Sequence, residues 1–202
     1  LHRPPRQPDS EGPVCCWHVF IDENAQALTT PDITRTVEQS VLAQVTLESL
    51  DANDQPGGMD DYSGELLKKL SLEVFSRKAL VTIDQELALQ NNLLIRSLLM
   101  VVAREFGEAA ASTVGQFQMV GSARLVSERL CRVPGLYRGG VQGLSQILAV
   151  HPAFQPLTYS QLQIEILDDT RIAVQIGDGP ALEEKDPYSW IKLLCSGADE
   201  GL

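Results

Sequence analysis

The hydrophobic pattern of this chain changes its period near residue 160. Before this point apolar residues recur every three or four positions, as they do on one face of an α-helix. Apolar and polar residues then alternate over residues 162–166 and again over residues 172–176, on either side of a turn at Asp168-Asp169. This alternation predicts a β-hairpin with one buried face. We therefore expect an α+β fold, with a helix-rich N-terminal two-thirds, a C-terminal antiparallel β-hairpin and a short closing helix.

The first thirteen residues differ in composition from the rest of the chain. They combine four prolines with charged residues and almost nothing apolar, which is typical of a disordered tail or linker. Residues 14–202 show no later linker and are long enough to bury a core, so we expect them to form a single α+β domain. Val14–Ile21 is rich in β-branched and aromatic residues and is a candidate third strand beside the hairpin.

Helix start and stop signals divide the first two-thirds of the chain. Thr30-Pro31-Asp32 predicts a helix start, and this helix should end near Leu50, before a loop at residues 51–60. Residues 66–75 have the apolar stripe of a second helix. Thr82–Gln85 has the spacing of a capping box and predicts the start of a helix that ends at Gly107. Apolar residues cover most of its circumference, so we expect this helix to be central and covered on several sides.

Residues 108–185, before the closing helix, are predicted to form shorter elements and a loop in addition to the hairpin. Residues 108–130 are predicted to be helical in two pieces, divided by Gly115 and Gly121. A further helix over residues 141–148 should stop at His151-Pro152, because proline disfavours a helical conformation in the residue before it. Residues 177–185 are expected to form a surface loop, and Asp186-Pro187 to start the closing helix.

Composition and charge exclude several classes of partner. The net charge of −11 and the pI near 4.6 oppose attraction to nucleic acid and to anionic lipid, so we expect neither as a partner. The longest apolar run, Leu93 to Ala103, is interrupted by Arg96 and Ser97 and is shorter than a membrane span, so no membrane insertion is expected. The four cysteines lack the density and spacing of a disulfide framework, which favours a cytoplasmic protein. Leu1 is not an initiator methionine, so we expect either a processed chain or a piece of a longer one.

One stretch reverses the charge of the chain. Residues 109–164 carry four arginines against a single glutamate, a net charge of +3, whereas the rest carries −14. Within this stretch a glycine-rich turn precedes a helix, and backbone N–H groups at a helix N-terminus beside a guanidinium form an anion site. The candidate ligand-binding residues are Arg132, Tyr137, Arg138, Gly139 and Gly140. The turn does not match a dinucleotide fingerprint or a phosphate loop, and its glycines have a simpler role in permitting a tight turn.

No motif of catalysis or metal binding is complete. Cys15, Cys16 and His18 are close in sequence, but zinc ligands normally come as spaced pairs from two segments, so we expect no metal and no cofactor. The histidines lie in no recognised catalytic setting. The paired acids, Glu183-Glu184 among them, fall in predicted loops, where charged side chains are normally solvated. We therefore assign no catalytic residue.

These observations favour a non-catalytic small-ligand-binding domain, sensory or accessory in role, whose ligand is anionic or amphipathic. Its pocket is expected between the helix that ends at Gly107, the glycine-rich turn and the hairpin. The alternative is a protein-interaction or assembly module whose apolar helix faces pair with a second chain, either another copy or the remainder of a larger protein. An enzyme without recognisable motifs is the third candidate, and it is the least favoured.

Overall fold

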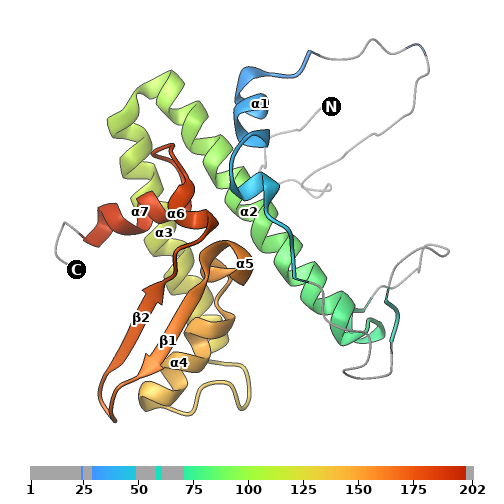
Figure 1. The fold of residues 1–202 in the computed structure, drawn as a ribbon, viewed down its shortest axis with the longest axis vertical. Coiled ribbons are helices and arrows are strands. Elements are labelled where there is room, and N and C mark those ends of the chain that lie inside the picture. The colour runs from blue at the N-terminus through green and yellow to red at the C-terminus, as the bar shows by residue number, and fades with distance from the viewer. Residues whose placement is uncertain (1–23, 25–28, 49–57, 61–70, 199–202) are drawn as a thin grey trace, which may run out of the picture. The chain divides into compact units, whose positions relative to one another are not determined.

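The helices and the hairpin occur in the predicted order. A computed structural model describes residues 24, 29–48, 58–60 and 71–198, and the chain separates into two units, Leu1–Thr30 and Pro31–Leu202. All elements below belong to the second unit (Figure 1). The α-helices are α1 (Asp32–Glu38), α2 (Arg77–Phe106), α3 (Glu108–Leu130), α4 (Gly140–Val150), α5 (Leu157–Ser160), α6 (Pro180–Glu183) and α7 (Trp190–Ala198). The strands are β1 (Leu162–Ile166) and β2 (Ile172–Ile176), and the 3-10 turns are η1 (Leu42–Gln44), η2 (Leu72–Val74) and η3 (Pro152–Phe154). The predicted α+β class is confirmed.

The hairpin has the predicted strands and a partly covered face. β1 pairs with β2 in antiparallel register, with Leu162 opposite Ile176 and Ile164 opposite Val174. The backbone N–H of Leu167 donates to the carbonyl of Arg171 and closes the turn. Ile164 is half-buried and β1 lies against α4, whereas Val174 is 45% exposed. The candidate third strand, Val14–Ile21, and the predicted tail lie outside the described residues.

α1 ends earlier than the sequence indicates. The helix stops at Glu38, twelve residues before the predicted end at Leu50. The N–H groups of Val41 and Leu42, which a continuing helix would bond to its own carbonyls, instead donate to the carboxylate of Glu184 at 3.4 and 2.9 Å. A side chain more than 140 residues away therefore ends this helix, and such a partner is invisible to local sequence patterns.

α2 also begins at a different residue. Ser76, and not Thr82, is its N-cap: the Ser76 hydroxyl accepts from the N–H of Ala79 at 3.1 Å and donates to Asp60 at 2.6 Å. Thr82 lies inside the helix and donates to the carbonyl of Lys78. The predicted helix over residues 66–75 is wrong at its end: residues 72–74 form η2, Phe75 and Ser76 are extended, and the backbone of Met59 pairs with that of residues 74–76. Its first part, residues 66–70, lies outside the described residues. The stop at Gly107 is confirmed.

α3 is one continuous helix, so the predicted break at its glycines is wrong. Gly115 serves packing: a Cβ atom there would lie 2.7 Å from a methyl carbon of Leu193 in α7 and 3.3 Å from one of Leu99 in α2. Gly121 has no neighbour within 4 Å of the same position. The absence of a side chain at Gly115 lets α2 and α7 approach the backbone of α3 closely.

The two glycines of α3 predict opposite effects on stability. Gly115→Val should lower the free energy of unfolding by about 1 to 3 kcal/mol, because it overfills the space between α2 and α7. Gly121→Ala should raise it by about 0.5 to 1 kcal/mol, since alanine is the better helix former and meets nothing. Urea denaturation followed by circular dichroism measures both. Changes of the same sign would contradict the packing role of Gly115.

The core of the unit gathers around a segment that the sequence indicates to be a surface loop. Part of residues 177–185 forms α6, where Ala181 is fully buried and Glu184 is buried just after the helix. The central apolar cluster draws on η1, α5, α6 and α7, and consists of Leu42, Tyr159, Ala181, Trp190 and Ile191. α7 begins at Trp190 and not at Asp186, whose carboxylate accepts the N–H of Tyr188 in a turn before the helix.

Candidate functional site

A buried ion pair joins α2 to the segment after α6. Nη2 of Arg96 lies 2.7 Å from Oε1 of Glu184, and both side chains are almost fully buried. The guanidinium N–H groups do not align with the carboxylate as ordinary hydrogen bonds, so the contact is mainly electrostatic. Asp186 lies 3.5 Å from the same nitrogen. Our expectation that Glu184 is a solvated surface acid is wrong, because this carboxylate is the centre of a buried network.

Tyr159 completes this network on the side of α5. Its hydroxyl donates to Glu184 at 3.4 Å. Burial, together with the negative charge of Glu184, raises the pKa of the Tyr159 phenol, so it stays protonated at neutral pH. The carboxylate also accepts the two N–H groups from η1, and it thereby connects four segments of the unit. Such a closed set of partners favours a structural role over a binding role.

The predicted ligand-binding residues lie together around the turn that leads into α4. Gly139 and Gly140 adopt positive φ values of 82° and 59°, a conformation that favours glycine. The ring of Tyr137 lies against Gly143 in the first turn of α4. Arg132 and Arg138 are exposed, and neither guanidinium pairs with a described residue. The turn thus has its expected shape, and anion binding there stays a prediction.

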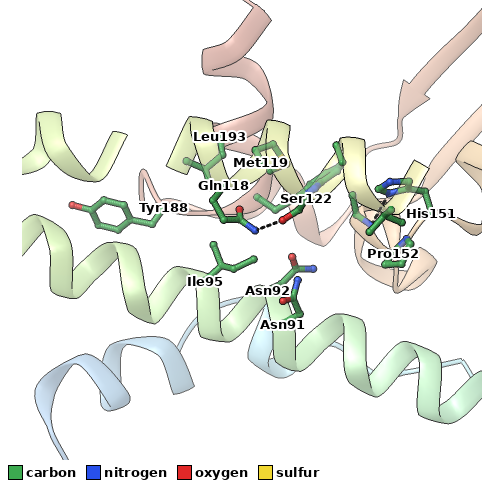
Figure 2. Close-up of a pocket in the computed structure, with 14 residues that line it drawn as sticks. Asn91, Asn92, Ile95, Gln118, Met119, Ser122, His151, Pro152, Tyr188 and Leu193 are labelled. Atoms are coloured by element: carbon green, nitrogen blue, oxygen red, sulfur yellow. Dashed lines mark hydrogen bonds between the residues drawn. The ribbon is translucent and has the colours of Figure 1, made fainter. Parts of the chain in front are cut away.

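A small cavity lies elsewhere, between α2, α3, η3 and the start of α7 (Figure 2). Its volume is about 70 Å³, well below the roughly 300 Å³ of a pocket for a drug-sized ligand. None of its lining residues belongs to the glycine-rich turn or the hairpin. The polar part of the lining consists of Asn91, Asn92, Gln118, Ser122, His151 and Tyr188. Figure 2 shows the Gln118 amide bonded to Ser122, at 2.9 Å. The cavity has room for a few water molecules.

His151 is the buried titratable group of this cavity. Its Nδ1 accepts the N–H of Ala153 at 3.1 Å, which places the proton of the neutral ring on Nε2. Burial lowers the pKa of His151, and the nearby carbonyl of Ala123 offsets part of this effect, although it makes no hydrogen bond of ordinary geometry with Nε2. Nε2 and the indole nitrogen of Trp190 are both shielded from solvent, so neither is available to a molecule in the cavity.

The lowered pKa of His151 predicts how stability depends on pH. The unfolded ring takes up a proton near pH 6.5, whereas the folded ring resists it, so the folded state loses stability as the pH falls below this value. His151→Gln, which cannot take up a proton, should remove this part of the dependence. Urea unfolding of both proteins at pH 7.5 and 5.5 measures the difference. An equal loss of stability in the two proteins would show that His151 does not cause it.

A second cavity opens on the surface between the first turn of α3 and α7. Its volume is about 450 Å³, and its lining includes Lys185, Lys192 and Tyr188. The Tyr188 hydroxyl donates to Glu108, and desolvation together with this carboxylate raises the pKa of Tyr188 to about 12. The lining therefore carries two lysines and one carboxylate, and this carboxylate already accepts a hydrogen bond from Tyr188. This cavity, which the sequence did not indicate, is large enough for a small anionic molecule.

An apolar stripe lies on the outer face of α2. Leu87, Leu94, Leu98 and Val101 are 61%, 69%, 49% and 37% exposed. Their steps of seven, four and three residues place them within an arc of roughly 60° and along about 21 Å of helix. We call these four residues the α2 stripe. The expectation that α2 is covered on several sides is wrong: its inner face is buried and its outer face is open.

α2 also has the length and composition of a membrane span. Among the described helices only α2 is long and apolar enough to cross a membrane: the mean hydropathy of its most apolar 18-residue window is 1.2, and 17% of that window is buried. A core helix of a soluble protein can have the same length and composition. Arg96, in the middle of the helix, is held in a buried ion pair within the folded unit. The absence of membrane insertion therefore stays a prediction.

Metal sites and relatives give no further guidance. Within the ranges that the structure describes, no three His, Cys, Asp or Glu side chains lie close enough to hold a metal ion. Cys131 is exposed and unpaired there, and Cys15, Cys16 and His18 lie outside those ranges. The chain matches no protein-family model, no curated protein and no solved structure.

Proposed function

We propose that residues 31–202 form a protein-interaction module that docks a helix of a second polypeptide on the α2 stripe. The observation that carries this proposal is the exposure of the stripe, with three leucines about half or more exposed in one line. Contiguous apolar patches on a folded protein mark interaction sites, whereas isolated exposed leucines are ordinary. Leu94, Leu98 and Val101 are contiguous because they lie about one helical turn apart, and Leu87 continues the same line two turns earlier, beyond the exposed Gln90 and Asn91.

The spacing of the stripe fits a helix as its occupant. Apolar residues separated by three, four and seven positions form the seam by which two helices pack side by side. The four side chains are on average about half exposed, so covering them would contribute roughly 3 to 6 kcal/mol of gross hydrophobic free energy, about half of the 1.5 to 3 kcal/mol for complete burial of each side chain. Part of this is offset by the entropy of association, so the stripe alone supports a reversible complex and not a permanent one.

A membrane surface fits the stripe less well. Helices that lie on membranes carry lysines and arginines on the polar face, which attract anionic lipid. The inner face of α2 is instead packed into the unit, with Leu99 fully buried and Arg96 paired to Glu184. The chain as a whole carries −11, which repels an anionic surface. These features support a protein as the occupant.

Photo-crosslinking from the stripe tests this function. A benzophenone amino acid replaces Leu94 in the full chain, and a matched control carries it at Leu167, which is 51% exposed in the hairpin turn. We expect a discrete crosslinked product from position 94 whose peptides map to one helical segment, and its loss when Leu98→Gln is added. Equal products from both positions, or none from position 94, would overturn the proposal.

The binding of a small anionic molecule is the second candidate. It is favoured by the surface cavity between α3 and α7, whose volume of about 450 Å³ lies in the usual range for ligand pockets and whose lysines suit an anion. The glycine-rich turn is the other place for such a ligand. Thermal shift with inorganic phosphate and with citrate, compared between Lys185→Ala/Lys192→Ala and the parent protein, tests the cavity. No stabilisation by either anion would remove this candidate.

Arg138 gives a separate prediction for the turn. Since its side chain is exposed and makes no described ion pair, Arg138→Ala should change the free energy of unfolding by less than about 0.5 kcal/mol. If the turn binds phosphate or citrate, the same substitution should weaken that binding. Urea unfolding and calorimetric titration of the anion measure the two effects. A variant that unfolds instead would show that Arg138 is a structural partner.

A further inference from the structure

The charges beside the α2 stripe indicate what kind of helix it receives. Asp84, Glu86, Arg104 and Glu105 lie on the outer half of α2, within about one turn of the two ends of the stripe. Arg104 is already paired with Glu105, whose Oε1 lies 2.8 Å from its Nε. Asp84 and Glu86 make no ion pair with any described residue. The borders of the stripe are therefore acidic and partly uncompensated.

We infer that the occupant of the α2 stripe is a basic amphipathic helix, with apolar anchors along one face and lysines or arginines on either side of them. This inference rests on the proposed function and adds the chemistry of the partner. Lysine and arginine at the edges of the docked helix would meet Asp84 and Glu86, and the net charge of −11 would steer such a helix toward the protein.

The environment of Asp84 supports this inference. Asp84 is exposed on α2, and desolvation by the surrounding protein raises the pKa of its carboxyl. An acid that is desolvated without a cation is less stable than one that is paired. A lysine or arginine from a docked helix would supply the missing charge. A cationic partner would therefore stabilise the Asp84 carboxylate, whereas an acidic partner would destabilise it.

A second copy of the chain fits the same face less well. In an antiparallel pair centred on Leu94, Leu87 would meet the partner's Val101, and the apolar contacts would match. The acids at each end would then also meet: Asp84 and Glu86 would lie near the partner's Arg104 and Glu105, a net charge of −2 at either end. In a parallel pair Asp84 and Glu86 would meet their own counterparts. Both arrangements place like charges together, which a basic helix avoids.

Calorimetric titration of the full chain with three synthetic peptides of about 20 residues tests the inference. The first places leucines at the spacing of the stripe between lysines, the second replaces the lysines by glutamates, and the third scrambles the first. We expect the basic peptide to bind with a stoichiometry of one peptide per chain, and the acidic and scrambled peptides to bind at least ten times more weakly. Asp84→Asn/Glu86→Gln should weaken the basic peptide about 3- to 10-fold, as exposed ion pairs do, and Leu94→Gln/Leu98→Gln should abolish its binding. The matched control Leu167→Gln/Leu182→Gln, which changes two exposed leucines away from the stripe, should bind normally.

The outcomes separate this inference from the proposed function. If the basic and acidic peptides bind equally well, the inference that the occupant is basic fails, whereas the proposal that a helix docks on the α2 stripe stands. If no peptide binds and light scattering shows a dimer that Leu94→Gln/Leu98→Gln dissociates, the occupant is a second copy and the inference fails alone. Equal binding of the basic and scrambled peptides would also overturn it, since charge alone would then explain the affinity. If the chain is a monomer and binds none of the peptides, the inference fails. If position 94 also gives no crosslinked product, the proposed function fails as well.

Discussion

Glu184→Gln should lower the free energy of unfolding by about 3 to 5 kcal/mol, because it removes the buried counter-charge of Arg96 and leaves only the half-buried Asp186, 3.5 Å from Nη2. The glutamine has nearly the same volume, so the effect is electrostatic and not a matter of a cavity. The substitution also weakens the acceptor for the N–H groups of Val41 and Leu42, which lie 3.4 and 2.9 Å from the carboxylate. Hydrogen bonds to a charged acceptor are the stronger ones. Urea denaturation measures the loss.

A second variant separates the charge from the other contacts of Glu184. Arg96→Met/Glu184→Gln contains neither charge, so it should be more stable than Glu184→Gln alone, as a double-mutant cycle would show. Glu128→Gln breaks the exposed pair with Arg124 and should change stability by less than about 0.5 kcal/mol. If the double variant is no more stable than Glu184→Gln, the buried charge of Arg96 is not the cause of the loss.

Leu99→Ala should lower the free energy of unfolding by about 2 to 5 kcal/mol, the range for deleting a fully buried leucine. Leu99 has no exposed surface, and its methyl carbons lie beside Gly115 where α2 packs on α3. The neighbouring Leu98, about 100° further round the helix, is 49% exposed. Leu98→Ala should therefore cost much less, below about 1 kcal/mol, since little buried surface is lost.

This pair of leucines tests the division of α2 into two faces. Both substitutions remove the same atoms from adjacent positions of one helix, so helix propensity is the same and burial alone differs. Urea unfolding of the two variants under one condition gives the difference directly. Similar losses in the two variants would mean that the outer face of α2 is covered in solution, and the α2 stripe would then be no binding surface.

The elements that the sequence predicted well depend on local chemistry. The alternation at residues 162–166 and 172–176 needs only pairing of the two strands across a short turn, and the hairpin formed as expected. Gly107 adopts a φ of 90° where α2 ends, and α4 stops at Val150, just before His151-Pro152. In each case the residue that ends the element lies within it or beside it.

The elements that were mispredicted depend on distant partners. α1 ends early where the N–H groups of Val41 and Leu42, just after it, donate to Glu184, and residues 75 and 76 are extended where Met59 pairs with this segment. Gly115 looked like a helix breaker, yet it is a contact point for Leu99 and Leu193. Hydrophobic periodicity shows that a helix has apolar faces, but it does not show whether another element covers them. The α2 stripe was therefore mistaken for core.

The candidate site was only partly accessible from sequence. The glycine-rich turn around Arg138 has the predicted backbone, but the described cavities lie elsewhere. Their walls combine residues of α3, and in the smaller cavity also of α2, with residues near Tyr188, which are distant in the chain and carry no shared motif. The α2 stripe itself contains a readable pattern, since its leucines follow helical spacing. What the sequence lacked was the information that the described unit covers these side chains only in part.

Solvent accessibility of the leucine methyl groups is the most direct test of the open face of α2. Nuclear magnetic resonance of the methyl-labelled chain, with a soluble nitroxide added, reports on each leucine separately. We expect strong broadening of Leu94 and Leu98 in the unbound chain, little broadening of Leu99, and protection of Leu94 and Leu98 when the basic peptide is added. If Leu94 and Leu98 are as protected as Leu99 with no partner present, the chain covers its own α2 stripe, and the proposed docking surface does not exist.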